Sequence, residues 1–305
     1  MAWRVHLTNQ AIRSLDILSG KPPLLAVWTH RERVAFFDLE TGAPVEERVL
    51  KPGRAGERQS DRWREFVASL VAPNRVYLPV VHTPQAVIYA TNDGQMRLYQ
   101  VGDTDLFLDI EGKEIRLEAS GVNCFLSVGL DRVLGLIAAL DDKGKIHIFQ
   151  QHISVGVFDL GLSLQPELPS AIVISHGGAA IFVSDGHQIV LTNSSGRVRK
   201  QLEVHYFVGK IACSPNGKML ATSDLESGVL RLYNGDLMAT HQRHAFDLLA
   251  DATQLQLLAD LPPADVALTA LAAGNDGVLA FAMAGVVCVT DMEHLDALPR
   301  PQRLL

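Results

Sequence analysis

The chain has 305 residues, enough for one large domain or two small ones, of which 48% are hydrophobic and 20% charged. That balance is typical of a globular protein and excludes a disordered chain. Asp and Glu number 34 against 27 Lys and Arg, so the formal charge is −7. An acidic balance of this kind disfavours a dedicated nucleic-acid binder, which would carry a basic face.

The N-terminus, the apolar runs and the cysteines indicate the compartment of the protein. The first ten residues hold no apolar segment after a basic one, so we expect no secretory signal. The longest apolar run, Val278 to Val289, is shorter than the ~20 residues that cross a bilayer. Cys124, Cys213 and Cys288 lie in apolar surroundings with no CxxC spacing, which predicts buried, reduced thiols and no zinc site. These features predict a cytoplasmic protein with no membrane partner.

The first predicted element is the alternating segment Trp3 to Leu7, which belongs to no hairpin of its own. Six predicted hairpins follow it, each made of a strand-like run, a polar or glycine-containing turn and a second apolar run. In chain order the paired segments are 24–28 with 34–38, 83–94 with 96–100, 133–140 with 146–150, 180–184 with 189–193, 214–224 with 230–234, and 278–283 with 286–291, where 83–94 and 214–224 include their turns. The second and fifth hairpins share the same order of turn and strand residues.

The spacing of these hairpins predicts the architecture. The turn glycines Gly94, Gly144, Gly186, Gly228 and Gly285 are 50, 42, 42 and 57 residues apart. Repeats of about 40 to 50 residues with several strands each point to the blades of an all-β propeller. Six blades are predicted within one domain that spans residues 1–305, and a seventh, poorly marked blade is left open. Because the last repeat lacks an obvious fourth strand, we expect Trp3 to Leu7 to complete it and close the ring.

Four of the hairpins end in an aromatic residue followed by an acid or amide, namely Phe37-Asp38, Tyr99-Gln100, Phe149-Gln150 and Tyr233-Asn234. A Ser-Pro-Asn-Gly-Lys turn lies at 214–218, and Asp-Gly turns recur. With these features the units resemble degenerate WD40-type repeats, in which the aromatic-plus-acid or amide pairs take the family's Trp-Asp position. No Trp-Asp pair occurs, and His205 is the nearest equivalent of the family's Gly-His pair. The resemblance covers residues 11 to 291 and implies a propeller used as an interaction platform.

Two segments interrupt the repeat. Residues 51–65 form a basic stretch that contains Trp63, and a solvated insertion is favoured over a docking loop for an anionic partner. Residues 244–261 place Ala245, Leu248, Leu249 and later apolar residues at helical spacing. An amphipathic helix that packs on the propeller's own rim is favoured there over a partner-binding helix.

No strong catalytic or metal-binding signature occurs. The Gly-x-Ser-x-Gly, His-Glu-x-x-His, Walker and Gly-x-Gly-x-x-Gly motifs are all missing, and His241 and His244 lack a third ligand at a suitable spacing. We therefore expect no enzyme activity, no cofactor and no bound metal.

The turns between the second and third strands of the blades supply the candidate site. In a propeller these turns open on one face, where the sequence predicts seven carboxylates against two cationic groups. Asp is also common in tight turns because its side chain accepts hydrogen bonds from the turn backbone. Each of these Asp residues, taken alone, is therefore explained by the turn it stabilises. The residues predicted to meet a partner are Asp93, Asp142, Lys143, Asp185, His187, Asp224 and Glu226.

Two classes of function follow. One is a non-catalytic, monomeric scaffold whose acidic face binds a protein or a basic peptide, and not nucleic acid. The other is a propeller-type hydrolase, such as a metal-dependent sugar lactonase, in which carboxylates near the axis hold a divalent ion. The innermost strands are predicted at 14–18, 123–126, 172–174, 211–213 and 266–271, and they are almost wholly apolar. That composition favours the scaffold.

Overall fold

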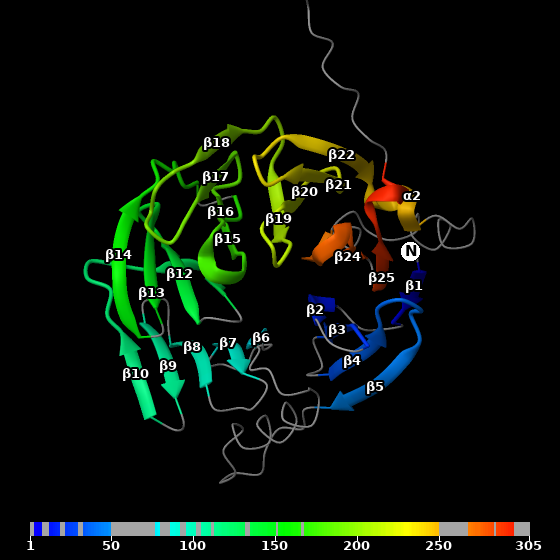
Figure 1. Cartoon of the computed structure of the whole chain (residues 1–305), viewed down its shortest axis with the longest axis horizontal. Helices are drawn as coiled ribbons and strands as arrows, with labels where there is room; N and C mark the ends of the chain where they lie inside the picture. Colours follow the sequence, from blue (N-terminus) through cyan, green and yellow to red (C-terminus); the bar gives the residue numbers. More distant parts are fainter. Residues whose placement is uncertain are drawn as a thin grey trace, which may run out of the picture.

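The computed structural model shows an all-β chain. It describes residues 3–7, 12–18, 22–29, 33–49, 77–79, 86–91, 96–101, 105–110, 113–131, 135–150, 152–165, 168–249, 268–283 and 285–295. These residues form six antiparallel sheets, each of which follows the chain as a meander. The arrangement is consistent with a β-propeller (Figure 1).

The first three sheets come from the first half of the chain. Sheet 1 contains β2 (Ile12–Leu18), β3 (Leu24–Thr29), β4 (Arg33–Asp38) and β5 (Pro44–Val49). Sheet 2 contains β6 (Tyr77–Pro79), β7 (Ala86–Thr91), β8 (Met96–Val101), β9 (Asp105–Ile110) and β10 (Lys113–Leu117). Sheet 3 contains β11 (Phe125–Leu130), β12 (Leu136–Asp141), β13 (Lys145–Gln150) and β14 (Ile153–Asp159). The fifth strand of sheet 2, β10, was not anticipated from the repeat.

The other three sheets come from the second half and from the N-terminus. Sheet 4 contains β15 (Ala171–Ile174), β16 (Ile181–Ser184), β17 (Gln188–Thr192) and β18 (Lys200–Glu203). Sheet 5 contains β19 (Val208–Cys213), β20 (Met219–Asp224), β21 (Val229–Asn234) and β22 (Ala239–His244). Sheet 6 contains β23 (Leu268–Ala273), β24 (Leu279–Met283), β25 (Val286–Thr290) and β1 (Trp3–His6).

The six predicted hairpins are therefore present as the middle strands of the six sheets. The N-terminal strand also lies where the sequence predicts, because β1 pairs with β25 in antiparallel register, with Trp3 opposite Val289 and His6 opposite Val286. The tryptophan ring then reaches the next sheet, where its Nε1 donates to the carbonyl of Leu39 at 2.8 Å. The two ends of the sheet series are thus connected through β1.

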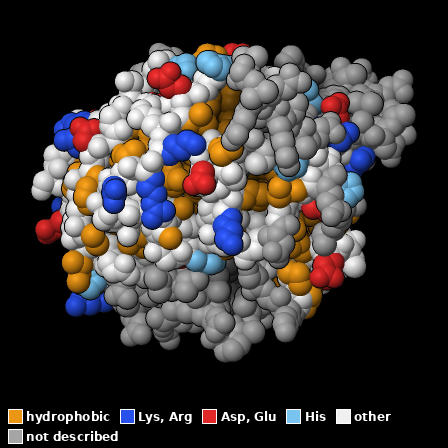
Figure 2. All heavy atoms as spheres, turned by 45° about the horizontal axis from the view of Figure 1, so that its top comes forward, with side chains coloured by type: hydrophobic (Ala, Val, Ile, Leu, Met, Phe, Trp, Pro, Cys, Tyr) orange, Lys and Arg blue, Asp and Glu red, His pale blue; other side chains and the backbone are white. Residues whose placement is uncertain are grey.

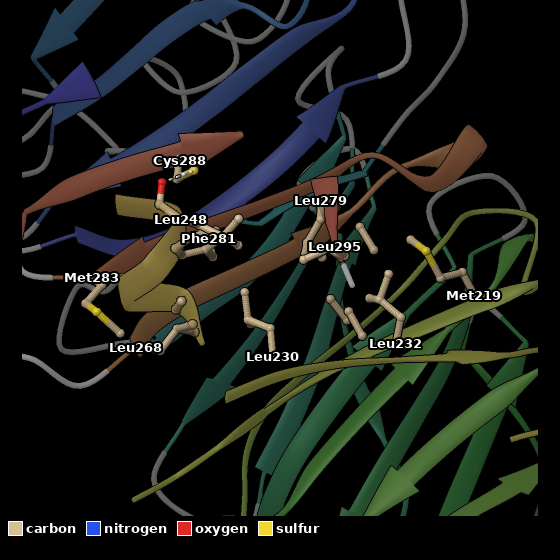
Figure 3. Packing of buried hydrophobic residues seen from close by; sticks show 14 of the residues in the cluster. Met219, Leu230, Leu232, Leu248, Leu268, Leu279, Phe281, Met283, Cys288 and Leu295 are labelled. Carbon is tan, nitrogen blue, oxygen red and sulfur yellow. Dashed lines mark hydrogen bonds between the residues drawn. The ribbon is translucent and has the colours of Figure 1, made fainter. Parts of the chain in front are cut away.

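The hydrophobic core lies between successive sheets. Alternate residues of a strand point to opposite faces of its sheet, where a neighbouring sheet can cover them. Between sheets 5 and 6, Leu230 and Leu232 face Leu279 and Phe281 (Figure 3). Corresponding apolar clusters join sheets 2 and 3, sheets 3 and 4, sheets 4 and 5, and sheets 6 and 1. Each sheet is stabilised by its neighbours, since one sheet alone would leave both apolar faces in water.

The described helices are short. The helix α2 (Ala245–Leu249) begins the predicted amphipathic segment, and Ala245 and Leu248 are buried against sheet 6. That placement agrees with packing on the molecule's own rim. Single 3-10 turns occur at His176–Gly178, Asn275–Gly277 and Met292–His294. None of the described helices has the length and apolar character that a membrane span requires. Residues 51–65 and 250–261 of the two predicted insertions lie outside the described residues.

Candidate functional site

One end of sheets 3, 4 and 5 carries the turns from which the site was predicted. We call it the turn face and define it by the turns 141–144, 185–187 and 224–228 together with the loops that lead into β11, β15 and β19. Backbone contacts place each turn beside such a loop: the amide of Asp142 donates to the carbonyl of Cys124 at 3.0 Å, and that of Leu225 to Phe207 at 2.7 Å. Turns that are about 40 residues apart in sequence therefore share one surface.

Asp142 and Lys143 tie the turn of sheet 3 to the preceding loop. The Oδ2 atom of Asp142 accepts a hydrogen bond from Asn123 Nδ2 at 2.9 Å, and the Lys143 ammonium donates to the carbonyl of Gly121. The hydrogen bond from the Asn123 side chain lowers the pKa of Asp142 from its ordinary value, against a smaller opposing effect of burial. Asp142 is half-buried and Lys143 exposed, so both have atoms at the surface.

The neighbouring carboxylate, Asp141, is buried and serves the fold. Its Oδ1 atom accepts the amides of Lys143 and Lys145 at 2.9 Å each, and its Oδ2 atom lies 2.8 Å from His147 Nε2. The ring of His147 is itself buried and packs edge-on against Phe125. This buried pair was not foreseen, because a turn Asp and a strand His six residues apart show no distinguishing pattern in the sequence.

Asp185 is also buried, with 1% of its surface exposed. Its Oδ1 atom accepts the amides of His187 and Gln188, while its Oδ2 atom accepts the Gln188 side chain and the amide of Ser163. We had predicted that Asp185 would face a partner, but its carboxylate lies inside the turn. The physical reason is that a short carboxylate can satisfy several amides which a tight turn would otherwise leave unpaired.

Asp224 and Glu226 lie on the turn of sheet 5. Asp224 accepts the amides of Glu226 and Ser227 at 3.0 and 3.3 Å, and its Oδ2 atom lies 3.6 Å from an Arg231 nitrogen. Partial burial raises the pKa of Asp224, but the hydrogen bonds from Ser227 and Glu226 and the Arg231 charge outweigh it, so the net pKa is lowered. Glu226 is exposed, and its side chain is free to meet solvent or a partner.

The turn face also brings Phe207 and Leu225, which the sequence does not predict as site residues, near His187 and Glu226, which it does. The His187 and Phe207 rings meet edge to face with 5.1 Å between centroids. The Leu225 amide donates a hydrogen bond to the carbonyl of Phe207, and Leu225 is 44% exposed. We call His187, Phe207, Leu225 and Glu226 the Phe207 patch. One signal in the sequence pointed to it, namely that a leucine stands between two acids where a polar turn residue is usual.

A polar network lies beneath this patch. The Arg231 guanidinium stacks 3.9 Å above the Tyr206 ring, next to Phe207 in the chain. The Tyr206 hydroxyl is 2.7 Å from both Thr222 Oγ1 and the Tyr233 hydroxyl. Burial raises the pKa of both tyrosines, so they stay neutral donors and acceptors at physiological pH. The network therefore fixes the loop that presents Phe207.

The accessible charge of the turn face is smaller than predicted. Asp141 and Asp185 are buried, Asp142 and Asp224 are half-buried acceptors, and Glu226 is exposed. Asp93, like the turns at 30–32 and 92–95, lies outside the described residues. Within the ranges that the structure covers, no group of three or more His, Cys, Asp or Glu side chains is arranged to hold a metal ion.

Comparisons with known proteins bear on the fold. No protein-family model matches the sequence, and no curated protein matches it. Among solved structures, the crystal structure of Raptor from Chaetomium thermophilum matches with a TM-score of 0.65 and 10% sequence identity. The match covers 97% of this chain and 29% of Raptor, so the chain spans less than a third of that protein's length. In total 1435 solved chains match, which marks a widely used propeller-like fold that carries no activity by itself.

Proposed function

We propose that this chain is a closed six-bladed β-propeller that acts as a non-catalytic scaffold and binds a protein or peptide through its turn face. The observation that carries the proposal is the Phe207 patch, in which apolar and aromatic side chains lie at the surface on a fixed base. The central contact is Leu225, 44% exposed and held against Phe207. The expected partner presents an apolar side chain next to Lys or Arg, because the patch includes Glu226 and is bordered by Asp224.

Closure is supported by the contacts between the sheets. Apolar clusters join five successive pairs of sheets, and the innermost strands β2 and β6 of sheets 1 and 2 lie next to each other. A closed ring gives the turn face a rigid support, so that its loops lose little conformational entropy when a partner binds.

Binding at the patch is supported by its chemistry. A rigid aromatic ring beside a part-exposed leucine and a carboxylate resembles the small groups of residues that dominate protein interfaces. Burying the exposed part of Leu225 contributes about 1 kcal/mol, and the rings of Phe207 and His187 add further apolar area. Glu226 adds orientation and partner selection, because rim charges act mainly on specificity and association rate.

The test compares proteins captured from a native lysate by the wild-type chain, by Leu225→Ser and by Val45→Ser. The control residue Val45 is 54% exposed, comparable with the value for Leu225, but lies on the outer strand β5 of sheet 1, outside the turn face. We expect Leu225→Ser to lose a partner that Val45→Ser keeps. Identical partner sets for all three folded proteins would overturn the proposed site.

A second measurement then isolates the electrostatic part. With the captured partner purified, the Kd of Glu226→Gln is compared with that of the wild type at low and physiological salt. We expect a loss of about three- to tenfold that shrinks as salt rises, because exposed charges are screened over about 10 Å. A Kd that does not respond to this substitution would exclude Glu226 from the interface.

A further inference from the structure

The opposite end of sheets 4 and 5 carries a second set of exposed side chains. Strand β17 leads away from the turn face to the loop 193–199, and β21 leads likewise to the loop 234–238. Because β17 has five residues, these loops lie about 17 Å from the turn face. A ligand on one end therefore does not occupy the other.

Both loops are built in the same way. Asn193 Oδ1 accepts the amides of Ser195 and Arg197 at 3.1 Å each. Asn234 Oδ1 accepts the amides of Asp236 and Met238 at 3.0 Å each. The amide side chains thus fix the backbone from which the neighbouring residues project, which reduces the entropy that binding would cost.

The two loops and a third turn lie side by side. The Lys200 ammonium, at the start of β18, donates to the carbonyl of Asp236. Gly235 packs on Lys218, since a Cβ atom on this glycine would lie 3.5 Å from the lysine Cα. The backbone turn that bears Lys218 is therefore next to the loop that bears Met238. We define the cationic loop surface as Arg197, Val198, Arg199, Lys200, Lys218 and Met238.

Positive charge exceeds negative charge on this surface. Arg197, Arg199 and Lys218 are exposed, and none of them forms an ion pair within the described part of the chain. Asp236 is the acidic residue of these loops, and because it is exposed it offsets only one of these charges. Figure 2 turns the edge that bears β18 and β22 toward the reader and shows Lys and Arg side chains spread over it, with apolar, neutral and a few Asp or Glu side chains among them. A local excess of cations in a chain with net charge −7 requires a specific explanation.

Apolar side chains accompany the cations. Met238 is 58% exposed and Val198 is 40% exposed, and the latter stands between the two arginines in sequence. Arginine presents a planar fork that binds carboxylates in bidentate fashion. Methionine adapts its unbranched side chain to apolar groups of different shape. The combination fits a ligand that carries both carboxylates and an aliphatic or aromatic residue.

We propose that the cationic loop surface is a second docking site, and that its ligand is an acidic peptide segment of another protein with an apolar residue among its carboxylates. Single-stranded nucleic acid fits less well, because the surface as defined has no aromatic side chain for base stacking. This inference goes beyond the proposed function. The turn face prefers a partner with basic residues and the cationic loop surface prefers one with acidic residues, so the chain would bridge two partners.

The test uses a fluorescein-labelled octapeptide, Glu-Glu-Leu-Glu-Glu-Leu-Glu-Glu, and fluorescence anisotropy with the full chain. We expect saturable binding that the double variant Arg197→Glu/Arg199→Glu weakens by about tenfold or more, with a strong dependence on salt. The control is Lys113→Glu/Lys210→Glu, which changes the net charge equally at two exposed lysines elsewhere. Equal weakening by both double variants, or no binding to the wild type, would overturn the proposal.

Two further arms define the ligand chemistry. Replacing both leucines of the peptide by serine, or Met238 by serine, is expected to weaken binding about fivefold, since each change removes an apolar contact. An oligodeoxynucleotide of equal charge serves as a competitor, and tighter binding of the oligonucleotide than of the peptide would contradict an acidic-peptide site. Leu225→Ser should bind the octapeptide as the wild type does, because Leu225 lies on the turn face. The octapeptide therefore tests the cationic loop surface independently of the function proposed for the turn face.

Discussion

At the scale of single residues, three aspartates with the same position in their sheets show how one residue type serves structure. Asp141, Asp185 and Asp224 each follow or end the second strand of a sheet, and each accepts the amide two residues further on at 2.9 to 3.0 Å. They differ in the side chain that takes the second oxygen, which is His147, Gln188 or Arg231. All three carboxylates accept the same backbone hydrogen bond of the turn, whereas the side chain that contacts the second oxygen differs from sheet to sheet.

The first prediction concerns the most heavily bonded of them. Replacing Asp185 by alanine removes the acceptor for three backbone amides and the Gln188 side chain in a buried place. We expect the free energy of unfolding to fall by about 2 to 4 kcal/mol, measured by urea denaturation. Glu226→Ala, on an exposed turn position, is the control and should change it by less than about 0.5 kcal/mol. A loss no larger than the control's would contradict an architectural role for Asp185.

At the scale of elements, the outer strands differ in how they protect their free edge. Proteins usually protect such edges with charges, Pro or short length. Strands β1, β5, β10, β18 and β22 all contain Arg, Lys or Glu, and β5 also begins with Pro44. Strand β14 has no charged residue before its last, Asp159, and Ile153, Val155 and Val157 are 63%, 50% and 50% exposed. Its one irregularity is a bulge opposite Phe149.

The second prediction follows from that edge. Val155→Lys should reduce the association that occurs when the protein is concentrated or heated, because a charge on an edge strand opposes strand pairing between molecules. Light scattering during a temperature ramp measures it. The matched control is Val45→Lys on β5, where the valine is 54% exposed but Glu46, Glu47 and Arg48 follow it. Equal scattering by both variants would exclude β14 as the responsible element.

At the scale of the whole molecule, β1 connects the last sheet to the first. Trp3 packs on Phe37 with 6.1 Å between ring centroids, and it covers Gly42 so closely that a Cβ there would lie 2.6 Å from the indole ring. Gly42 also has φ +73, which favours glycine in any case. Strand β1 forms its backbone hydrogen bonds with β25 of sheet 6, and its Trp3 side chain packs on sheet 1. It therefore contributes to the stability of both sheets.

The third prediction tests this connection with Cys288, which lies opposite Arg4 across the β1 and β25 pair. Burial raises the pKa of the Cys288 thiol to about 12, partly opposed by Arg4, so at pH 8 the group is protonated and unreactive. Deleting residues 1–8 should lower the free energy of unfolding by about 3 to 5 kcal/mol and make Cys288 reactive toward iodoacetamide.

Two readouts keep that experiment decisive. Thermal unfolding reports the loss of stability, and mass spectrometry of the alkylated protein reports the reactive thiol. Cys124, in the loop before β11, and Cys213, in β19, are half-buried and serve as internal references for the reagent. An unchanged midpoint together with a protected Cys288 would show that β1 does not hold the sheet series together.

Local sequence pattern determined the repeating part of this protein. Alternating apolar residues and turn chemistry specified the six hairpins, and the segment Trp3 to Leu7 was assigned correctly to the last sheet because that sheet lacked a strand. Such features depend on chain neighbours, whose geometry is set by backbone dihedral angles and hydrogen bonds. The fifth strand of sheet 2 escaped prediction because Lys113–Leu117 pairs as a strand without being part of the repeat.

Only the tertiary structure decided which side chains are accessible. Asp185 and Asp224 hold the same position in their sheets, yet Asp185 is buried and Asp224 is half-buried, and only for Asp185 does the amide of a preceding loop, that of Ser163, donate to the carboxylate. His187, Phe207 and Leu225 meet only because β18 leads back between two turns, and Lys200 meets Asp236 only because two sheets stand side by side. Exposure is a property of packing between sheets, whereas the strands themselves follow from residues adjacent in the chain.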